Sequence, residues 1–226
     1  MTLKLENVEV SIQAAPILRG VSLEVGTGER MGLVGRNGAG KTTVMRTITG
    51  LANMAAGRVL WNGEDISSMP PRQRAQLGFG YMPEDRRLVP DLTVEENMLL
   101  PAWVNKEIDG QKGLEFIYDL MPELTEMALR KALLLSGGQQ KMVALGRALI
   151  AGRKLLLLDE PFEGVAPALA KRISEVITSL RGEGLSVLIA QSELSHSLEL
   201  LQRECVIERG EIIKVNVIEQ ARKESS

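Results

Sequence analysis

The chain has 226 residues, which is enough for one sizeable α/β domain with a small insertion. Its hydrophobic content of 44% and charged content of 25% are typical of a globular protein and exclude a disordered chain. A net charge of −2 and an aromatic content of 3% argue against a protein that binds nucleic acid through a basic field or stacked aromatic rings.

Three further absences bear on the compartment. The single cysteine, Cys205, rules out an internal disulfide and fits a reducing compartment. Residues 1–10 alternate apolar and polar side chains and lack the apolar core of a signal peptide. No apolar run approaches the roughly 20 residues that cross a bilayer. We therefore expect a soluble or peripheral protein.

In the first half of the chain, alternating apolar residues predict two strands, over 3–12 and 17–25, that pair as an antiparallel arm with an irregularity near Asn7. The short apolar segment 30–34 predicts a buried strand, and residues 41–49 predict the helix that follows it. Further strands are predicted over 78–82 and over 58–61, the latter closed by the turn pair Asn62-Gly63.

In the second half, residues 92–134 are rich in Met, Leu and Glu and predict a mostly helical insertion, with capping-box spacing at Thr93 and Glu96. Beyond it we expect helices over 136–150, 167–181 and 192–203, strands over 154–158 and 185–190, and a closing hairpin over 204–208 and 211–215. The polar tail from Glu219 is expected to fray. Strands that alternate with helices indicate a mainly parallel sheet with helices on both faces, and ligands bind such sheets at the carboxyl ends of the strands.

A glycine-rich loop, Gly35-Arg36-Asn37-Gly38-Ala39-Gly40-Lys41-Thr42, joins a predicted strand to a predicted helix. Its pattern is that of a phosphate-binding loop, whose backbone N–H groups and helix N-terminus surround the phosphates. Lys41 would contact the β and γ phosphates, and Thr42 would offer its hydroxyl to Mg²⁺. We expect these eight residues and Thr43 to bind a nucleoside triphosphate. A chance turn is the alternative, and the strand before the loop and the helix after it weigh against that alternative.

Two carboxylates, Asp159 and Glu160, follow the buried strand formed by four consecutive leucines. Taken alone, they are ordinary solvated residues at a strand end. With a phosphate loop upstream, the favoured interpretation is that Asp159 holds Mg²⁺ and that Glu160 orients or deprotonates the attacking water.

A second glycine motif, Leu135-Ser136-Gly137-Gly138-Gln139, opens a predicted helix. Ser136 and Gln139 have capping-box spacing, so the motif can serve as a second anion site or simply as a capped helix.

The phosphate loop, then LSGGQ, then LLLLDEP, in that order, resembles the ATP-binding-cassette family over essentially the whole chain. The resemblance implies a P-loop NTPase of RecA-like α/β fold, with a mainly parallel sheet, an N-terminal antiparallel β arm and an inserted α-helical subdomain. It places the core at about 1–86 and 150–226 and the helical subdomain at about 87–149. It also implies ATP, Mg²⁺ and a head-to-tail dimer in which Ser136, Gly137, Gly138 and Gln139 reach the ATP of a second cassette.

Three stretches resemble most closely the ATPases of branched-chain amino acid and amide importers: Met82-Pro83-Glu84-Asp85-Arg86-Arg87, Leu92-Thr93-Val94-Glu95-Glu96-Asn97, and Glu160-Pro161-Phe162-Glu163-Gly164-Val165-Ala166-Pro167. This likeness implies two transmembrane permease subunits, an external solute-binding protein and a place on the cytoplasmic face of a bacterial inner membrane. It also implies that residues 84–97 belong to a groove for a cytoplasmic helix of the permease. A solvated loop is the alternative.

Several positions depart from the family pattern. Glu84 stands where most cassettes have a glutamine near the metal, and Gln191 stands where most have a histidine near the γ-phosphate. Both changes are common in the importer branch. Ile12 takes the place of the aromatic that usually stacks on adenine, and Ala166 replaces a frequent aspartate. The only histidine, His196, is expected to be a surface residue.

Two other functions stay open on the sequence. One is a non-transport cassette that acts on nucleic acid or ribosomes. Such proteins usually carry two cassettes in one chain, long coiled coils or basic linkers, which this chain lacks. The other is a regulatory nucleotide-binding module without useful hydrolysis, against which Glu160 argues.

Overall fold

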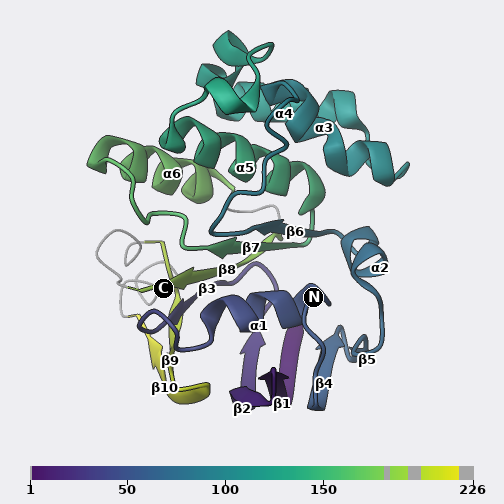
Figure 1. Ribbon diagram of the computed structural model, residues 1–226, viewed down its shortest axis with the longest axis vertical. Helices are drawn as coiled ribbons and strands as arrows, with labels where there is room; N and C mark the ends of the chain where they lie inside the picture. The colour runs from purple at the N-terminus through teal and green to yellow at the C-terminus, as the bar shows by residue number, and fades with distance from the viewer. Residues whose placement is uncertain (1, 181–183, 193–199, 219–226) are drawn as a thin grey trace, which may run out of the picture.

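The computed structural model describes residues 2–180, 184–192 and 200–218, and these residues form layers of helix and sheet (Figure 1). The central layer is a six-stranded sheet. Its strand order is β10 (Glu211–Val217), β9 (Arg203–Glu208), β3 (Arg30–Val34), β8 (Ser186–Gln191), β7 (Leu155–Asp159) and β6 (Phe79–Met82). All neighbouring strands are parallel except the β9–β10 hairpin. The carboxyl ends of β3, β7 and β8 therefore meet at one edge, as predicted.

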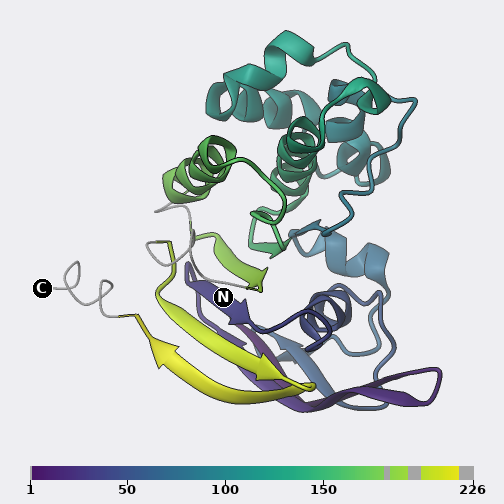
Figure 2. The same ribbon diagram turned by 60° about the vertical axis from the view of Figure 1, so that its left-hand side comes forward.

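A second, antiparallel sheet contains the predicted opening arm. Its order is β2 (Ala15–Val25), β1 (Leu3–Ile12), β4 (Ala56–Trp61) and β5 (Glu64–Asp65). The β1–β2 register shifts between Leu5 and Val8, where Asn7 has a positive φ of 48°, so the irregularity expected there is confirmed. The tip of the β9–β10 hairpin joins this sheet, because Gly210 accepts a hydrogen bond from the Arg19 N–H at 2.9 Å (Figure 2).

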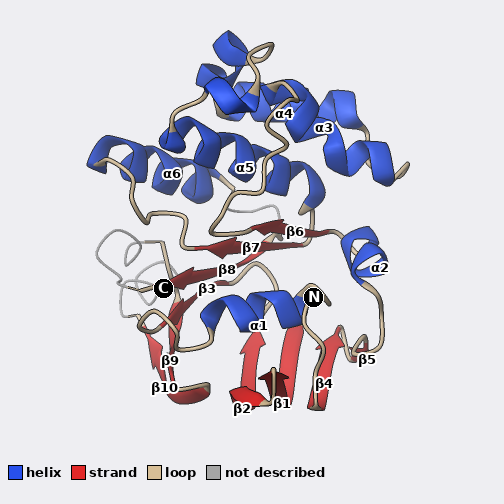
Figure 3. Cartoon of the chain, in the orientation of Figure 1, coloured by secondary structure: helices blue, strands red, loops and turns tan. Residues whose placement is uncertain are grey.

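The helices cover the central sheet on both faces (Figure 3). Helix α1 (Lys41–Ile48) lies between the two sheets, and α2 (Pro71–Gln76) lies near the edge strand β6. The opposite face carries α3 (Val94–Val104), α4 (Gly110–Leu120), α5 (Gly137–Ala151) and α6 (Pro167–Ser179), with two 3₁₀ turns at Pro122–Met127 and Ala132–Leu134. Helices α3 and α4 and both turns fall inside the helical insertion predicted over 92–134, and α5 corresponds to the helix predicted over 136–150. The division into core and subdomain stays a prediction.

Strand β7 separates two hydrophobic cores. Leu156 and Leu158 pack into the core beneath α3–α6, whereas Leu155 and Leu157 pack into the core around α1 and the antiparallel sheet. All four side chains are fully buried. Burial on both faces explains why this strand is apolar without alternation.

Several local predictions were wrong or incomplete. The helix expected over 192–203 does not include its ends, because Ser192 directly follows β8 and Arg203 already belongs to β9. Its middle, with His196, lies outside the described residues. Strand β5 and helix α2 were not predicted, since segments of two and six residues carry too little periodicity. Within the described ranges, no helix is both long and apolar enough to span a membrane.

Candidate functional site

The glycine-rich loop runs from the carboxyl end of β3 into the first turn of α1. Gly38 and Gly40 have positive φ angles of 81° and 111°, a region that favours glycine. A Cβ on Gly35 would lie 2.3 Å from the carbonyl oxygen of Ile207, so this position has no room for a side chain. No side chain caps α1, and the N–H groups of its first turn are left for an anion.

A cavity of about 500 Å³ opens over this loop. Its size is that of a small-molecule site. It is lined by Gly35, Arg36, Asn37, Gly38, Ala39, Ser192, Val206, Ile207, Glu208 and Arg209. The cavity thus brings together the loop after β3, the residue after β8 and the start of the β9–β10 hairpin.

The Lys41 side chain folds back over the loop that precedes it. Its Nζ donates hydrogen bonds to the carbonyl oxygens of Gly35 at 2.6 Å and Arg36 at 3.3 Å. It also forms an ion pair with Glu160 Oε1 at 3.0 Å, and both side chains are only 5% exposed. The lysine that the sequence assigned to phosphate and the carboxylate that it assigned to water are therefore direct partners here.

The Asp159 carboxylate lies fully buried at the end of β7. Burial raises its pKa to about 6, and hydrogen bonds from Thr42 and Tyr81 oppose that rise. Tyr81 donates its hydroxyl to Oδ2 at 3.3 Å, whereas Oδ1 is buried without a hydrogen-bond partner among the described residues. An oxygen without a partner, close to a threonine hydroxyl and beneath a phosphate loop, suits Mg²⁺, which takes few protein ligands and several phosphate or water oxygens.

Glu160 is held on both sides by the residue after β8. Ser192 Oγ lies 2.6 Å from Glu160 Oε1, and the Ser192 N–H donates to Oε2 at 3.1 Å. The same hydroxyl lies 2.9 Å from Asn37 Oδ1 on the phosphate loop. Glu160 has a positive φ of 50°, an uncommon conformation for a residue other than glycine. The carboxylate is thus fixed by contacts from two separate segments, the start of α1 through Lys41 and the residue after β8.

Gln191 and Glu84 both lie close to the residues described above. Gln191 ends β8, its carbonyl accepts the Gly35 N–H at 3.1 Å, and its buried Oε1 has no hydrogen-bond partner among the described residues. Glu84 is exposed and shares a cavity of about 190 Å³ with Thr42, Tyr81 and Asp159. The three predicted metal-site residues, Thr42, Asp159 and Glu84, therefore line one cavity.

The second glycine motif opens α5 on the opposite side of the central sheet from α1 (Figure 1). Ser136 is the N-cap. Its hydroxyl accepts the Gln139 N–H at 3.2 Å, and the Gln139 Oε1 accepts the Ser136 N–H at 2.9 Å, which completes the predicted capping box. None of residues 136–139 lines the cavity over the phosphate loop.

Ile12 is half-exposed at the end of β1, near the tip of the β1–β2 hairpin, and is not among the residues that line the loop cavity. Its contact with a base stays a prediction. Sequence reasoning missed Ser192 and Tyr81. A polar residue directly after a buried strand was the available signal for Ser192, whereas nothing in the pattern marks Tyr81.

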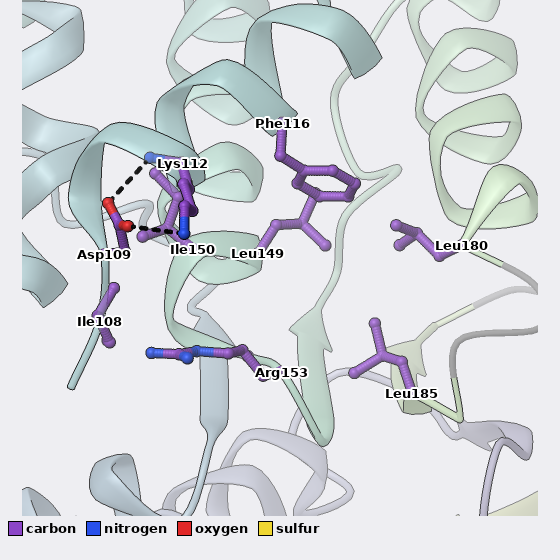
Figure 4. A pocket seen from close by; sticks show the side chains of 11 residues that line it. Ile108, Asp109, Lys112, Phe116, Leu149, Ile150, Arg153, Leu180 and Leu185 are labelled. Atoms are coloured by element: carbon purple, nitrogen blue, oxygen red, sulfur yellow. Dashed lines mark hydrogen bonds and ion pairs between the residues drawn. The ribbon is translucent and has the colours of Figure 1, made fainter.

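Another cavity, of about 380 Å³, shares no lining residue with the loop cavity. Phe116 of α4 and Leu149 of α5 point into it, and Leu180 and Leu185 close one side (Figure 4). The residues of the glycine loop and of the strand ends described above all lie outside it, so it is not the phosphate site.

Comparison with known proteins identifies the family. The ABC transporter family profile matches residues 18–163, which is more than half of the chain. The lipopolysaccharide export system ATP-binding protein LptB of Haemophilus influenzae is 38% identical over 217 residues, covering 95% of this chain and 90% of that protein. The high-affinity branched-chain amino acid transport ATP-binding protein BraG of Pseudomonas aeruginosa is 38% identical over 196 residues, covering 87% and 84%.

A crystal structure of a nucleotide-free ATP-binding cassette from an ABC transporter is 30% identical and superposes with a TM-score of 0.86, covering 99% of this chain and 94% of that one. An ADP conformation of a cassette superposes with a TM-score of 0.83 at 30% identity, with the same coverage. This chain belongs to the ABC transporter family and is an ATP-binding cassette ATPase that uses ATP and Mg²⁺.

Proposed function

We propose that this cassette powers solute uptake, with ATP held between two cassettes in a head-to-tail dimer, and that the solute is a branched-chain amino acid or a related amide. It would work at the cytoplasmic face of a bacterial inner membrane with two permease subunits and an external solute-binding protein. Membership of the family supports the ATPase activity and the permease partners. The direction of transport and the class of solute are our proposal.

The observation that carries the hydrolytic part is the contact between Lys41 and Glu160 under the phosphate loop. When triphosphate enters, Lys41 exchanges the Glu160 carboxylate for phosphate oxygens, which carry more charge. Glu160 then loses its cation while Ser192 still holds both of its oxygens. It is left as a carboxylate that accepts a hydrogen bond or a proton from water. Gln191 donates a hydrogen bond to the γ-phosphate but carries no proton near pH 7.

The metal would be held by the Thr42 hydroxyl and by the Asp159 carboxylate, and Glu84 lines the same cavity. When bound, Mg²⁺ neutralises the charge that develops on the phosphate oxygens. No cluster of three or more metal-binding side chains exists within the described parts of the chain. This fits a cation that phosphate and water oxygens coordinate for the most part.

A permease groove is supported by the segments on either side of residues 89–95. Val94 N–H donates to Arg130 O, and Ala132 N–H donates to Leu92 O, so residues 128–134 run alongside this segment. The adjoining surface exposes apolar side chains that belong to neither hydrophobic core, namely Val89 (41%), Leu133 (51%), Leu134 (60%) and Leu129 (85%). Below it, the buried Asn97 amide donates to the carbonyl oxygens of Val89 and Leu92 and fixes the loop.

The likeness to BraG and the three sequence stretches support the amino-acid importer. The equal identity to LptB supports a second candidate, an ATPase that serves lipopolysaccharide export. The two candidates require different membrane subunits, so the identity of the permease decides between them.

The test is to purify the chain with its membrane subunits, to identify those subunits, and to reconstitute the complex in proteoliposomes. We expect uptake permeases, ATP-dependent accumulation of branched-chain amino acids, and a turnover that Glu160→Gln lowers by about 10²-fold or more. Lipopolysaccharide-export subunits would contradict the importer. Wild-type turnover in Glu160→Gln would contradict the role of Glu160.

A further inference from the structure

Lys141 is a buried cation on the helix that begins at the second glycine motif. It lies in the second turn of α5, five residues beyond the N-cap Ser136, and is only 6% exposed. Its Nζ donates to the carbonyl oxygens of Glu160 at 2.8 Å and Pro161 at 3.5 Å, and also to that of Glu163. All three acceptors belong to the backbone that leaves the end of β7.

These contacts fall on strained backbone. Glu160 adopts the left-handed region, with φ at 50°, without being a glycine. Such residues persist where surrounding contacts over-determine them. The Glu160 N–H is held by Ala190 O at 2.9 Å, and its carbonyl is held by Lys141. Hydrogen bonds from a charged donor are roughly twice as strong as neutral ones, which suits Lys141 to this task.

Burial of this lysine carries a cost. Burial lowers the pKa of Lys141, while the carboxylates of Glu163, Glu160 and Glu84 act in the opposite direction and Arg86 adds to the lowering. In the described parts of the chain, its hydrogen bonds go to carbonyl oxygens rather than to a carboxylate. An apolar side chain of the same length would fill the space without that cost. The lysine therefore contributes through its three donors.

The two ends of this contact belong to two different nucleotide sites. The N-terminus of α5 carries Ser136–Gln139, which the proposed dimer presents to the ATP of the partner cassette. The carbonyl of Glu160 belongs to the residue that handles the water at this chain's own ATP. Lys141 joins them through one rigid helix and one set of hydrogen bonds.

We propose that Lys141 is a positioning residue that sets the backbone of Glu160 and couples its carboxylate to engagement of the α5 N-terminus by the second nucleotide. This inference rests on the proposed function, in particular on the role of Glu160. It assigns no chemistry to Lys141 itself. Loss of its donors should lower the rate of hydrolysis and leave nucleotide binding in place.

The experiment uses the full chain assembled with its membrane subunits and measures kcat and KM for ATP. Lys141→Met keeps the length of the side chain and removes the donors. We expect kcat to fall by about 10- to 100-fold, as misplacement of a catalytic group does, with KM changed less than about threefold. Lys112→Met, at an 82% exposed lysine of α4, is the control and should match wild type.

A second background separates a positioning role from general damage to the fold. In Glu160→Gln the carboxylate is already gone, so adding Lys141→Met should lower the residual rate no further. An equal fold-loss in both backgrounds would overturn the proposal, as would wild-type kcat in Lys141→Met. If Glu160→Gln alone keeps the wild-type rate, the proposed function fails first, and the two failures are distinguishable.

Lys141→Gln covers the case in which the methionine variant does not fold. Its amide retains a neutral donor to the same carbonyls, so kcat should recover part of the loss at an unchanged KM. If Lys141→Met unfolds and Lys141→Gln turns over ATP at the wild-type rate, the positioning role is wrong.

Discussion

Helices α1 and α5 both begin at glycine-rich motifs, yet their first turns differ. At the start of α1, Gly40 has a φ of 111°, and no side chain caps the helix. At the start of α5, Ser136 and Gln139 satisfy each other's backbone N–H groups in a complete capping box. The first helix start has no side-chain cap for its N–H groups, whereas at the second the side chains accept the N–H groups of Ser136 and Gln139 and leave those of Gly137 and Gly138 uncapped. A cassette built this way can hold nucleotide on its own loop first and recruit the second motif afterwards.

The largest effect is expected at the start of α1, which has no side-chain cap. Lys41→Ala removes the cation that serves the phosphates and leaves Glu160 buried without its ion pair. We expect ATP turnover to fall by about 100-fold or more, with weaker ATP binding. The measurement is phosphate release together with nucleotide titration in the assembled complex. If both binding and turnover were retained, Lys41 would not contact the phosphates.

Asp159→Asn tests the nucleotide site at the start of α1 through the stability of the folded chain. The pKa of Asp159 is about 6 in the folded chain, against an ordinary value of 3.8, so the ionised carboxylate destabilises the nucleotide-free fold above pH 6. The folded wild-type chain takes up a proton as the pH falls from 6 towards 4, and its stability rises there. The neutral asparagine should therefore raise the free energy of unfolding at pH 8 by about 3 kcal/mol at most.

The higher free energy of unfolding of Asp159→Asn should approach that of the wild type as the pH falls towards 4. Denaturant unfolding at several pH values would measure this change. Addition of ATP and Mg²⁺ should reverse the order, because only the wild-type carboxylate supports the metal. A variant that is less stable than wild type at pH 8 without nucleotide would contradict the assignment of a costly charge to Asp159.

The smallest effect is expected at the start of α5, which has a side-chain cap. Ser136→Ala breaks the capping box and should cost about 1 kcal/mol of stability, as the loss of an N-cap does. ADP binding to a single chain should not change, because residues 136–139 lie outside the loop cavity. Calorimetric titration with ADP checks the binding, and denaturant unfolding checks the stability. Weaker ADP binding in the isolated chain would place Ser136 at its own loop instead.

The parts of the site that the sequence predicted are those governed by short-range rules. The glycine loop between β3 and α1, the capping box at Ser136 and the carboxylates after β7 each follow from local pattern and strand-end logic. The apolar run 155–158 of β7 was also predicted from local pattern, because burial on both faces removes alternation. Local sequence patterns therefore predict most of the residues proposed for the nucleotide site.

The missed parts depend on contacts between distant segments. Ser192 reaches Asn37 across 155 residues and Glu160 across 32, and Lys141 reaches Glu160 across 19. A serine after a strand and a lysine on a helix are ordinary patterns, so no periodicity marks the half-buried Ser192 or the buried Lys141 as contacts of Glu160. The Lys41–Glu160 ion pair was missed for another reason, since the motif describes the loop with phosphate in it.

The double burial of β7 has a consequence for how this chain can vary. Its leucines alternate between two cores that share no member, as the residues of the neighbouring strand β8 also do. A substitution that adjusts the helical face to a new membrane partner must therefore leave the packing against α1 undisturbed, or it will displace the two carboxylates at the end of the strand. Cassettes of this kind should diversify in the exposed segments near residues 89 and 129–134 while the leucines of β7 stay almost constant.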